Sequence, residues 1–290
     1  MKKSRKLATL GICSALFLGL AACQQQHATS EGTNQRQSSS AKVPWKASYT
    51  NLNNQVSTEE VKSLLSAHLD PNSVDAFFNL VNDYNTIVGS TGLSGDFTSF
   101  THTEYDVEKI SHLWNQKKGD FVGTNCRINS YCLLKNSVTI PKLEKNDQLL
   151  FLDNDAIDKG KVFDSQDKEE FDILFSRVPT EATTDVKVHA EKMETFFSQF
   201  QFNEKARMLS VVLHDNLDGE YLFVGHVVVL VPADDGFLFV EKLTFEEPYQ
   251  AIKFASKEDC YKYLGTKYAD YTGEGLAKPF IMDNDKWVKL

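Results

Sequence analysis

Residues 221–243, with the sequence YLFVGHVVVLVPADDGFLFVEKL, decide the fold of this chain. Two runs rich in Val, Leu and Phe lie on either side of a turn sequence, ADDG, at 233–236. A third apolar run at 209–213 precedes them across a second turn sequence, NLDG, at 216–219. Apolar runs of this length, separated by turn residues, predict an antiparallel β-meander.

Apolar residues at helical spacing dominate the chain before this meander. Ser57-Thr58-Glu59-Glu60 has the pattern of a capping box, and Asp70-Pro71-Asn72 precedes an apolar stripe that ends near Val88. Further elements are predicted in this order: a helix at about 106–117, a longer helix at 185–202, a helix after Ser256 and a short strand near 279–282. We therefore expect an α+β fold in which N-terminal helices pack on a C-terminal antiparallel β-meander.

The first 23 residues have the features of a secretion signal. Four of the first six residues are basic, and residues 7–20 form an apolar segment too short to span a bilayer comfortably. A run of small residues then ends in Cys23, which is typical of the cleavage and acylation site of a bacterial lipoprotein. An ordinary cleaved signal or an N-terminal anchor helix is the alternative interpretation.

The segment after Cys23 is predicted to be a flexible tether. Residues 24–42 are rich in Gln, Ser, Thr and Asn, so they have too little apolar surface to offset the entropy lost on ordering. We divide the chain into a lipoprotein signal peptide at 1–22, a lipidated Cys23 with its tether at 23–44, and a folded region at 45–290. That last length permits one large domain or two small ones, and we expect a single α+β domain.

The charge of the chain limits its partners. The formal net charge is −9, and removal of the four basic signal residues leaves −13 on the exported part. Such an acidic surface repels nucleic acid and anionic lipid headgroups, so attachment to the membrane is expected to come from acyl chains on Cys23. The predicted location is the extracellular face of the cell membrane.

Cysteine usage argues against a metal site or a disulfide framework. Beyond the signal and anchor the chain keeps Cys126, Cys132 and Cys260, an odd number. Cys126 and Cys132 are six residues apart, which on a helix places them about 120° apart around the axis and prevents a disulfide. No Cys/His pair has the spacing of a zinc site, and the acidic stretches at 153–155 and 215–220 are interpreted as turns. We expect no metal and no cofactor.

The sequence around Cys126 predicts a reactive thiol. A polar turn, Gly123-Thr124-Asn125, precedes Cys126, and an apolar helical stretch follows it, so the thiol is expected at a helix N-terminus. The helix dipole and the unpaired N–H groups favour a thiolate at that position, and the same N–H groups can hold an oxyanion. Cys126 is therefore the candidate nucleophile.

His226 is the candidate base, and Glu241 is its candidate orienting residue. His226 is polar in a strand whose other members are apolar. If the turn at 233–236 has two or four loop residues, His226 and Glu241 share a sheet face as diagonal neighbours, and the carboxylate can orient the imidazole. An odd loop length would place Glu241 on the opposite face.

Two interpretations of these three residues remain open. A thiol at a helix start, a His on a strand a hundred residues later and an acid on the next strand follow the order of parts in papain-like and NlpC/P60-like hydrolases. Alternatively, Cys126 is a small buried hydrophobe, His226 is a sheet histidine with satisfied hydrogen bonds, and Glu241 is half of a surface pair with Lys242 or with a neighbouring strand residue.

Six strings also resemble recurring segments of the DUF4300 family, over almost the whole region from Tyr49 to the C-terminus. They are Thr50-Asn51-Leu52, Val74-Asp75-Ala76-Phe77-Phe78, Thr124-Asn125-Cys126-Arg127-Ile128, Gly225-His226-Val227, Phe239-Val240-Glu241-Lys242-Leu243 and Glu247-Pro248-Tyr249-Gln250-Ala251. The resemblance implies a secreted or lipid-anchored protein of Gram-positive bacteria and a single-domain construction. It implies no activity. Arg127 departs from the papain-like pattern, in which that position is commonly small or aromatic.

Two functions are consistent with these patterns. In the first, the chain is a membrane-anchored cysteine hydrolase that cuts an amide, such as one in a cell-wall peptide, with Cys126, His226 and Glu241 as its catalytic residues. In the second, it is a non-catalytic surface lipoprotein that binds a peptide, a wall fragment or a protein, and the same residues are buried and inert.

Overall fold

The computed structural model of the protein describes residues 45–100 and 103–290. Its α-helices are α1 (Gln55–Ser66), α2 (Pro71–Val88), α3 (Val107–Lys118), α4 (Cys126–Leu134), α5 (Phe151–Gly160), α6 (Ser165–Leu174), α7 (Val186–Phe197) and α8 (Lys257–Lys267). Its strands are β1 (Ala47–Thr50), β2 (Thr98–Ser99), β3 (Val138–Thr139), β4 (Val178–Pro179), β5 (Gln201–Phe202), β6 (Arg207–Asp215), β7 (Tyr221–Ala233), β8 (Gly236–Lys242), β9 (Tyr249–Phe254), β10 (Phe280–Asp283) and β11 (Lys286–Val288). The predicted α+β fold class is confirmed.

The meander forms the middle of a nine-stranded antiparallel sheet. Its order is β11-β10-β6-β7-β8-β9-β1-β2, with β4 paired to β7 outside this path. Ala233 pairs with Gly236, so only two residues form the loop between β7 and β8. Gly236 is required there because its φ is +135° and a Cβ would lie 2.2 Å from the carbonyl oxygen of Phe254.

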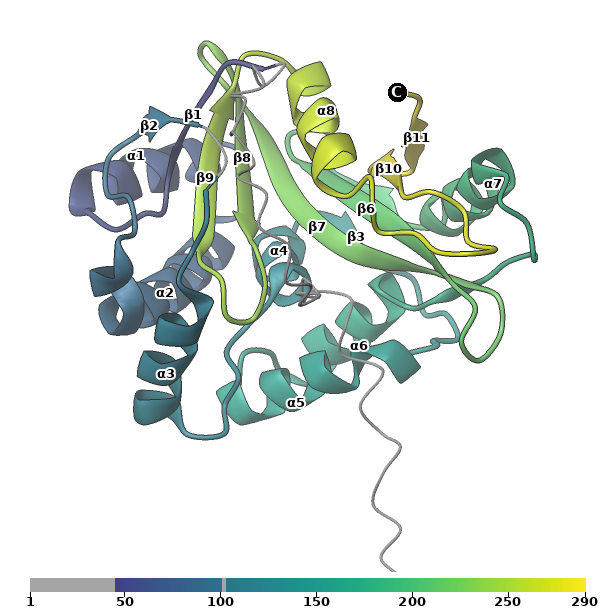
Figure 1. The fold of residues 1–290 in the computed structure, drawn as a ribbon, viewed down its shortest axis with the longest axis horizontal. Helices are drawn as coiled ribbons and strands as arrows, with labels where there is room; N and C mark the ends of the chain where they lie inside the picture. Colours follow the sequence, from purple (N-terminus) through teal and green to yellow (C-terminus); the bar gives the residue numbers. More distant parts are fainter. Residues whose placement is uncertain (1–44, 101–102) are drawn as a thin grey trace, which may run out of the picture. The chain divides into compact units, whose positions relative to one another are not determined.

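Helices cover both faces of this sheet. Alternate residues of β7 and β8 point to opposite faces: Val228, Leu230 and Phe239 pack in a cluster with α8, whereas Val227 and Val229 pack with the helices that precede the sheet in sequence. Figure 1 shows α8 beside the upper part of the sheet and α4 close to β7 and β8. The sheet is therefore buried on both sides, which explains why its strands are almost continuously apolar.

The strands β7 and β8 pair only over part of their length. Their ladder runs from Ala233 and Gly236 to Val229 and Val240, and beyond that point they separate, as can be followed in Figure 1. On its other edge β7 contains a bulge against β6, where Gly225 is skipped in the register. A Cβ at Gly225 would lie 2.4 Å from Leu213 Cδ1, so a larger residue there would require the Leu213 side chain to move. The opening between β7 and β8 receives the first turn of α4.

Several sequence predictions need correction at the level of elements. The first helix begins at Gln55, because Asn54 and not the predicted capping box accepts the N–H of Ser57. The helix predicted at 185–202 ends at Phe197, because Gln201–Phe202 pairs as β5 with β3. The acidic stretch at 153–155 is helical and belongs to α5, not to a turn. The helices α5 and α6 and the strands β1, β2, β3, β4, β5, β9 and β11 were not predicted.

Other sequence predictions fall outside the described residues. These are the signal peptide at 1–22, the acylated Cys23 and the tether at 23–44. Within residues 45–100 and 103–290, no helix combines the length and the hydropathy needed to cross a bilayer.

Candidate active site

Cys126 is the first residue of α4, as its sequence predicts. The side chain of Asn125 caps the helix by accepting the N–H of Ile128. Gly123 approaches the β8–β9 turn closely with a φ of +91°, and a Cβ there would lie 3.4 Å from Phe245 O. The N–H groups of the first helical turn have no acceptor within the helix, so the positive end of the α4 dipole lies beside the thiol.

Asp153 of α5 holds this first turn in place. Its Oδ1 accepts hydrogen bonds from Asn125 Nδ2 at 2.7 Å and from Arg127 Nε at 2.9 Å, while its Oδ2 lies 2.7 Å from Arg127 Nη2. The Asp153 side chain is 1 % exposed, so this bidentate ion pair is largely shielded from water. The acidic stretch that sequence analysis assigned to a turn therefore positions the candidate nucleophile.

Side chains of α4 satisfy the edge of β7 that β8 leaves unpaired. Arg127 Nη1 donates to Val224 O at 3.0 Å, Ser130 Oγ donates to Val227 O at 3.2 Å, and the backbone of Val227 hydrogen-bonds to the Cys126 sulfur. Buried backbone groups need such partners wherever a ladder ends. Arg127, which departs from the papain-like pattern, thus has a structural role in joining the helix to the strand.

The structure brings His226 and Glu241 together. His226 Nε2 lies 2.6 Å from Glu241 Oε2, on the face of the sheet that carries α8. Two residues of α8 complete the environment of the carboxylate: Tyr263 Oη donates to Glu241 Oε1 at 2.9 Å, and Lys267 Nζ lies 3.5 Å from Oε2. Although burial alone would raise it, the pKa of Glu241 is lowered to about 2 by the Lys267 charge and the His226 hydrogen bond.

Cys126 reaches His226 through the opening between β7 and β8. A hydrogen bond and an electrostatic attraction join the thiol to the imidazole, whose Nε2 contacts Glu241. Burial opposes charge on both groups. Their mutual attraction outweighs it, so the pKa of Cys126 is lowered and the pKa of His226 is raised. Both shifts favour a thiolate–imidazolium pair.

The three side chains are enclosed in this structure. Cys126, His226 and Glu241 are 4 %, 2 % and 1 % exposed. Tyr268, at the end of α8, stacks on the His226 ring at 5.1 Å between centroids, and Tyr271 packs against Tyr268. A hollow of about 370 Å³ nearby lies between α8 and the C-terminal residues, and none of the three site residues lines it.

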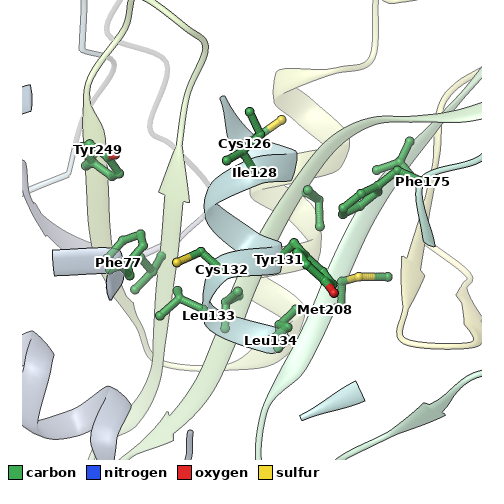
Figure 2. Packing of buried hydrophobic residues seen from close by; sticks show 14 of the residues in the cluster. Phe77, Cys126, Ile128, Tyr131, Cys132, Leu133, Leu134, Phe175, Met208 and Tyr249 are labelled. Atoms are coloured by element: carbon green, nitrogen blue, oxygen red, sulfur yellow. The ribbon is translucent and has the colours of Figure 1, made fainter. Parts of the chain in front are cut away.

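The other described cysteines are placed as passive residues. Figure 2 shows the Cys126 sulfur pointing away from Cys132, whose side chain points toward Phe77. Burial raises the pKa of the Cys132 thiol to about 12, and burial also raises the pKa of Cys260. The three described cysteines are free thiols. Among the described residues, no group of three or more His, Cys, Asp or Glu side chains is arranged to hold a metal ion.

Sequence reasoning named the three candidate residues that the structure brings together, but not the residues around them. Glu241 is not half of a surface pair with Lys242, because both residues are 1 % exposed and they point to opposite faces of β8. Lys267, Tyr263 and Tyr268 were not identified. The sequence offered one indication that such residues exist. Glu241 and Lys242 are adjacent charges in the otherwise apolar string FVEKL, and charges buried in a strand need partners.

This arrangement defines an α+β protein with a Cys-His-Glu site between a helix N-terminus and two strands. The matching family model is described as a domain of unknown function, DUF4300, and it covers residues 48–288, so the chain belongs to that family. No curated protein and no solved structure showed significant similarity to this chain.

Proposed function

We propose that the protein is a cysteine hydrolase that cuts an amide bond, anchored by a lipid on Cys23 to the extracellular face of the cell membrane. The observation that carries the enzymatic part is the convergence of Cys126, His226 and Glu241 from three separate elements. A buried apolar packing role for Cys126 would not require an imidazole at the thiol or a carboxylate behind the imidazole.

Each group has a role in the proposed reaction. The Cys126 thiolate attacks the amide carbon and forms a C–S bond, while the carbonyl oxygen becomes an oxyanion beside the first-turn N–H groups of α4. The His226 imidazolium donates its proton to the nitrogen as the C–N bond breaks, which releases an amine and leaves a thioester. Water, deprotonated by His226, then hydrolyses the thioester and regenerates the thiol. Glu241 stabilises the imidazolium and fixes its orientation.

Access to the thiol requires displacement of the residues that cover the site. Tyr271 is 38 % exposed and packs on Tyr268, which in turn covers the His226 ring. The segment after α8 is exposed from Ala269 to Gly275 and contains two glycines, so it has few contacts to lose on moving. The closed arrangement in this structure excludes water from the ion pair, and movement of these two rings would admit a substrate.

The enclosure of the site also favours a second candidate function. If the rings of Tyr268 and Tyr271 do not move, Cys126 and His226 are inert, and the protein is a non-catalytic surface lipoprotein that binds a peptide, a wall fragment or a protein. The two functions make opposite predictions about the reactivity of Cys126 in the folded state.

Alkylation of the folded, membrane-extracted protein by iodoacetamide at pH 6 tests the proposal. We expect Cys126 to be labelled at least about tenfold faster than Cys132 and Cys260, because only its thiol pKa is lowered. The rates are read by mass spectrometry of the separated peptides. A His226→Ala variant is expected to lose the selective labelling.

Two controls keep this test specific. His189 is also a buried histidine, hydrogen-bonded to Thr180 and Thr183 in another part of the fold, so His189→Ala should leave the labelling of Cys126 unchanged. The melting temperature of each variant is measured alongside to exclude unfolding. Equal labelling of the three thiols, or none before denaturant is added, would support the non-catalytic function instead.

A further inference from the structure

Lys242, the last residue of β8, is buried next to the candidate site without a role in the chemistry described above. It is 1 % exposed, and its Nζ lies 4.2 Å from the ring centroid of Tyr84 and 5.4 Å from that of Tyr249. A lysine is almost never buried to this degree unless its charge is compensated. Because β8 alternates its side chains, Lys242 lies on the α4 side of the sheet while Glu241 lies on the α8 side.

The acceptors of the Lys242 amine are three backbone carbonyls of the turn between β8 and β9. Nζ donates to Thr244 O at 2.8 Å, to Phe245 O at 3.2 Å and to Glu247 O. An ammonium has three N–H donors, so these three contacts use all of them. Lys242 therefore has no N–H left to donate to a substrate or an oxyanion, and it can act only through its charge and through the turn that it holds.

This turn lies against the segment that leads into Cys126. The Phe245 carbonyl that accepts from Lys242 is the same group that approaches Gly123, three residues before the thiol. The charges of Lys242 and Cys126 also interact directly. Lys242 thus connects to the nucleophile in two ways, through the position of the turn and through an electrostatic interaction.

We propose that Lys242 is a positioning residue for Cys126, which holds the β8–β9 turn against the segment that leads into the nucleophile and places a positive charge on the α4 side of its thiolate. This inference rests on the proposed function. With it, the side chains of Lys267, Glu241, His226, Cys126 and Lys242 alternate in sign when the ion pair forms. Arg127 adds a second positive charge that acts on Cys126, and Glu246 and Glu247 add negative charges that act on Lys242. Alternation of this kind stabilises the thiolate from the side opposite to His226.

The pH profile of Cys126 alkylation in a Lys242→Met variant tests this inference. Methionine keeps an apolar chain between the two tyrosine rings but removes the charge and its hydrogen bonds. Burial lowers the pKa of Lys242 to about 7, so the charge is present in the wild type at pH 6. We expect the midpoint of the alkylation profile to rise by about one pH unit, and the rate at pH 6 to fall about tenfold.

Matched variants separate this effect from a general loss of structure. Lys135 lies at the other end of α4 and pairs with Asp167, so Lys135→Met should leave the midpoint unchanged. Lys242→Arg keeps a positive charge and should keep the midpoint within about half a pH unit of the wild type. If Lys242→Met does not fold, the Lys242→Arg variant still tests the inference. A rise of one full pH unit in its alkylation midpoint would contradict a role for the charge.

The result that overturns the inference is a folded Lys242→Met variant with the wild-type midpoint. That result would leave the proposed function intact. By contrast, a wild-type protein in which Cys126 reacts no faster than Cys132 and Cys260 would remove the proposed function itself, before any Lys242 variant is examined.

Discussion

At the scale of single residues, Glu241 combines two properties that are costly in isolation. It is fully buried and it is charged, and its three contacts, with His226, Tyr263 and Lys267, compensate for the loss of water. A carboxylate held in this way keeps the imidazole charged, and the charged imidazole in turn lowers the pKa of the thiol. Glu241 therefore supports the lowered pKa of Cys126 indirectly, by adding to the attraction between the thiol and the imidazole that favours the charged form of His226.

A Glu241→Gln variant is expected to lose stability in a pH-dependent way. The pKa of Glu241 is lowered to about 2 in the folded protein from an ordinary value near 4.5, so its ionised form contributes stability above about pH 4.5, and this contribution disappears as the pH falls toward 2. We expect the variant to be about 3 kcal/mol less stable than the wild type at pH 7 and nearly equal to it near pH 2. Urea unfolding at a series of pH values measures the difference.

The control for this prediction is Glu60→Gln. Glu60 pairs with Lys253 at the surface, where both side chains are partly exposed, so its loss should cost less than about 1 kcal/mol. A destabilisation of Glu241→Gln that is the same at pH 7 and pH 3 would mean that lost packing, and not lost charge, is responsible.

At the scale of elements, the separation of β7 from β8 creates the site. A continuous ladder would have filled the space that the first turn of α4 occupies, and the sheet would have kept Cys126 and His226 on opposite faces. Arg127 and Ser130 satisfy β7 backbone groups in that space. The hydrogen bonds that β7 lacks where the ladder ends are thus replaced by hydrogen bonds from α4, the helix that carries the candidate nucleophile.

The end of α8 controls access to this opening, which predicts the effect of a Tyr268→Leu variant. Leucine keeps an apolar side chain but removes the ring that stacks on His226. We expect Cys126 to be alkylated about tenfold faster at pH 6 because the reagent reaches the thiol more easily, while the pH midpoint stays within about half a unit because the Glu241 contacts remain. Alkylation rates across pH 5 to 8 separate these two quantities.

Tyr261 supplies the matched control on the same helix. Its hydroxyl donates to Asp283 Oδ2 at 2.5 Å, away from His226, so Tyr261→Leu should leave the rate at Cys126 unchanged. Slower alkylation in Tyr268→Leu with an unchanged melting temperature would contradict a covering role for this ring.

Features of these elements that depend on residues close together in the sequence could be predicted, whereas features that depend on contacts between distant segments could not. The loop between β7 and β8 has two residues, Asp234 and Asp235. An even number of loop residues places His226 and Glu241 on the same face of the sheet, so this contact could be predicted from the turn sequence. In contrast, α5 begins at Phe151 without a side-chain cap, so no local signal marked its start or its role in anchoring Arg127. The covering ring of Tyr268 arrives from a helix after the meander, and its position follows only from tertiary packing.

At the scale of the whole molecule, burial of the sheet on both faces explains why one of its central strands could not be predicted from the sequence. The helices α2 and α8 were predicted from their caps, Asp70 and Ser256, whereas α6 was not predicted although Asp164 caps it. The strand β9 was not, because it is buried almost throughout and lacks the alternation of a half-exposed strand. The two-residue strand β2 is too short to show any pattern.

The placement of this domain at a membrane is a separate prediction, and it depends on Cys23. A flexible chain of about twenty residues has a typical end-to-end distance of about 25 Å, so a tether of the predicted length would hold a folded domain clear of the lipid surface. The exported part carries a formal net charge of −13 once the signal is removed, so its surface should not bind anionic lipid by itself. We therefore expect a Cys23→Ala variant to leave the detergent phase and to appear uncleaved or in the medium.

Phase partitioning and the mass of the N-terminal peptide measure this outcome in cells that produce the full chain. Cys126→Ala is the matched control, since it removes a thiol from the folded domain and should remain in the detergent phase with an acylated N-terminus. If Cys23→Ala partitions as the wild type does, the membrane must hold the protein by other means. The folded domain itself offers no helix for that purpose within residues 45–100 and 103–290, so an unchanged partition would require contacts between the domain surface and the membrane, and high salt would then release the protein if those contacts were electrostatic.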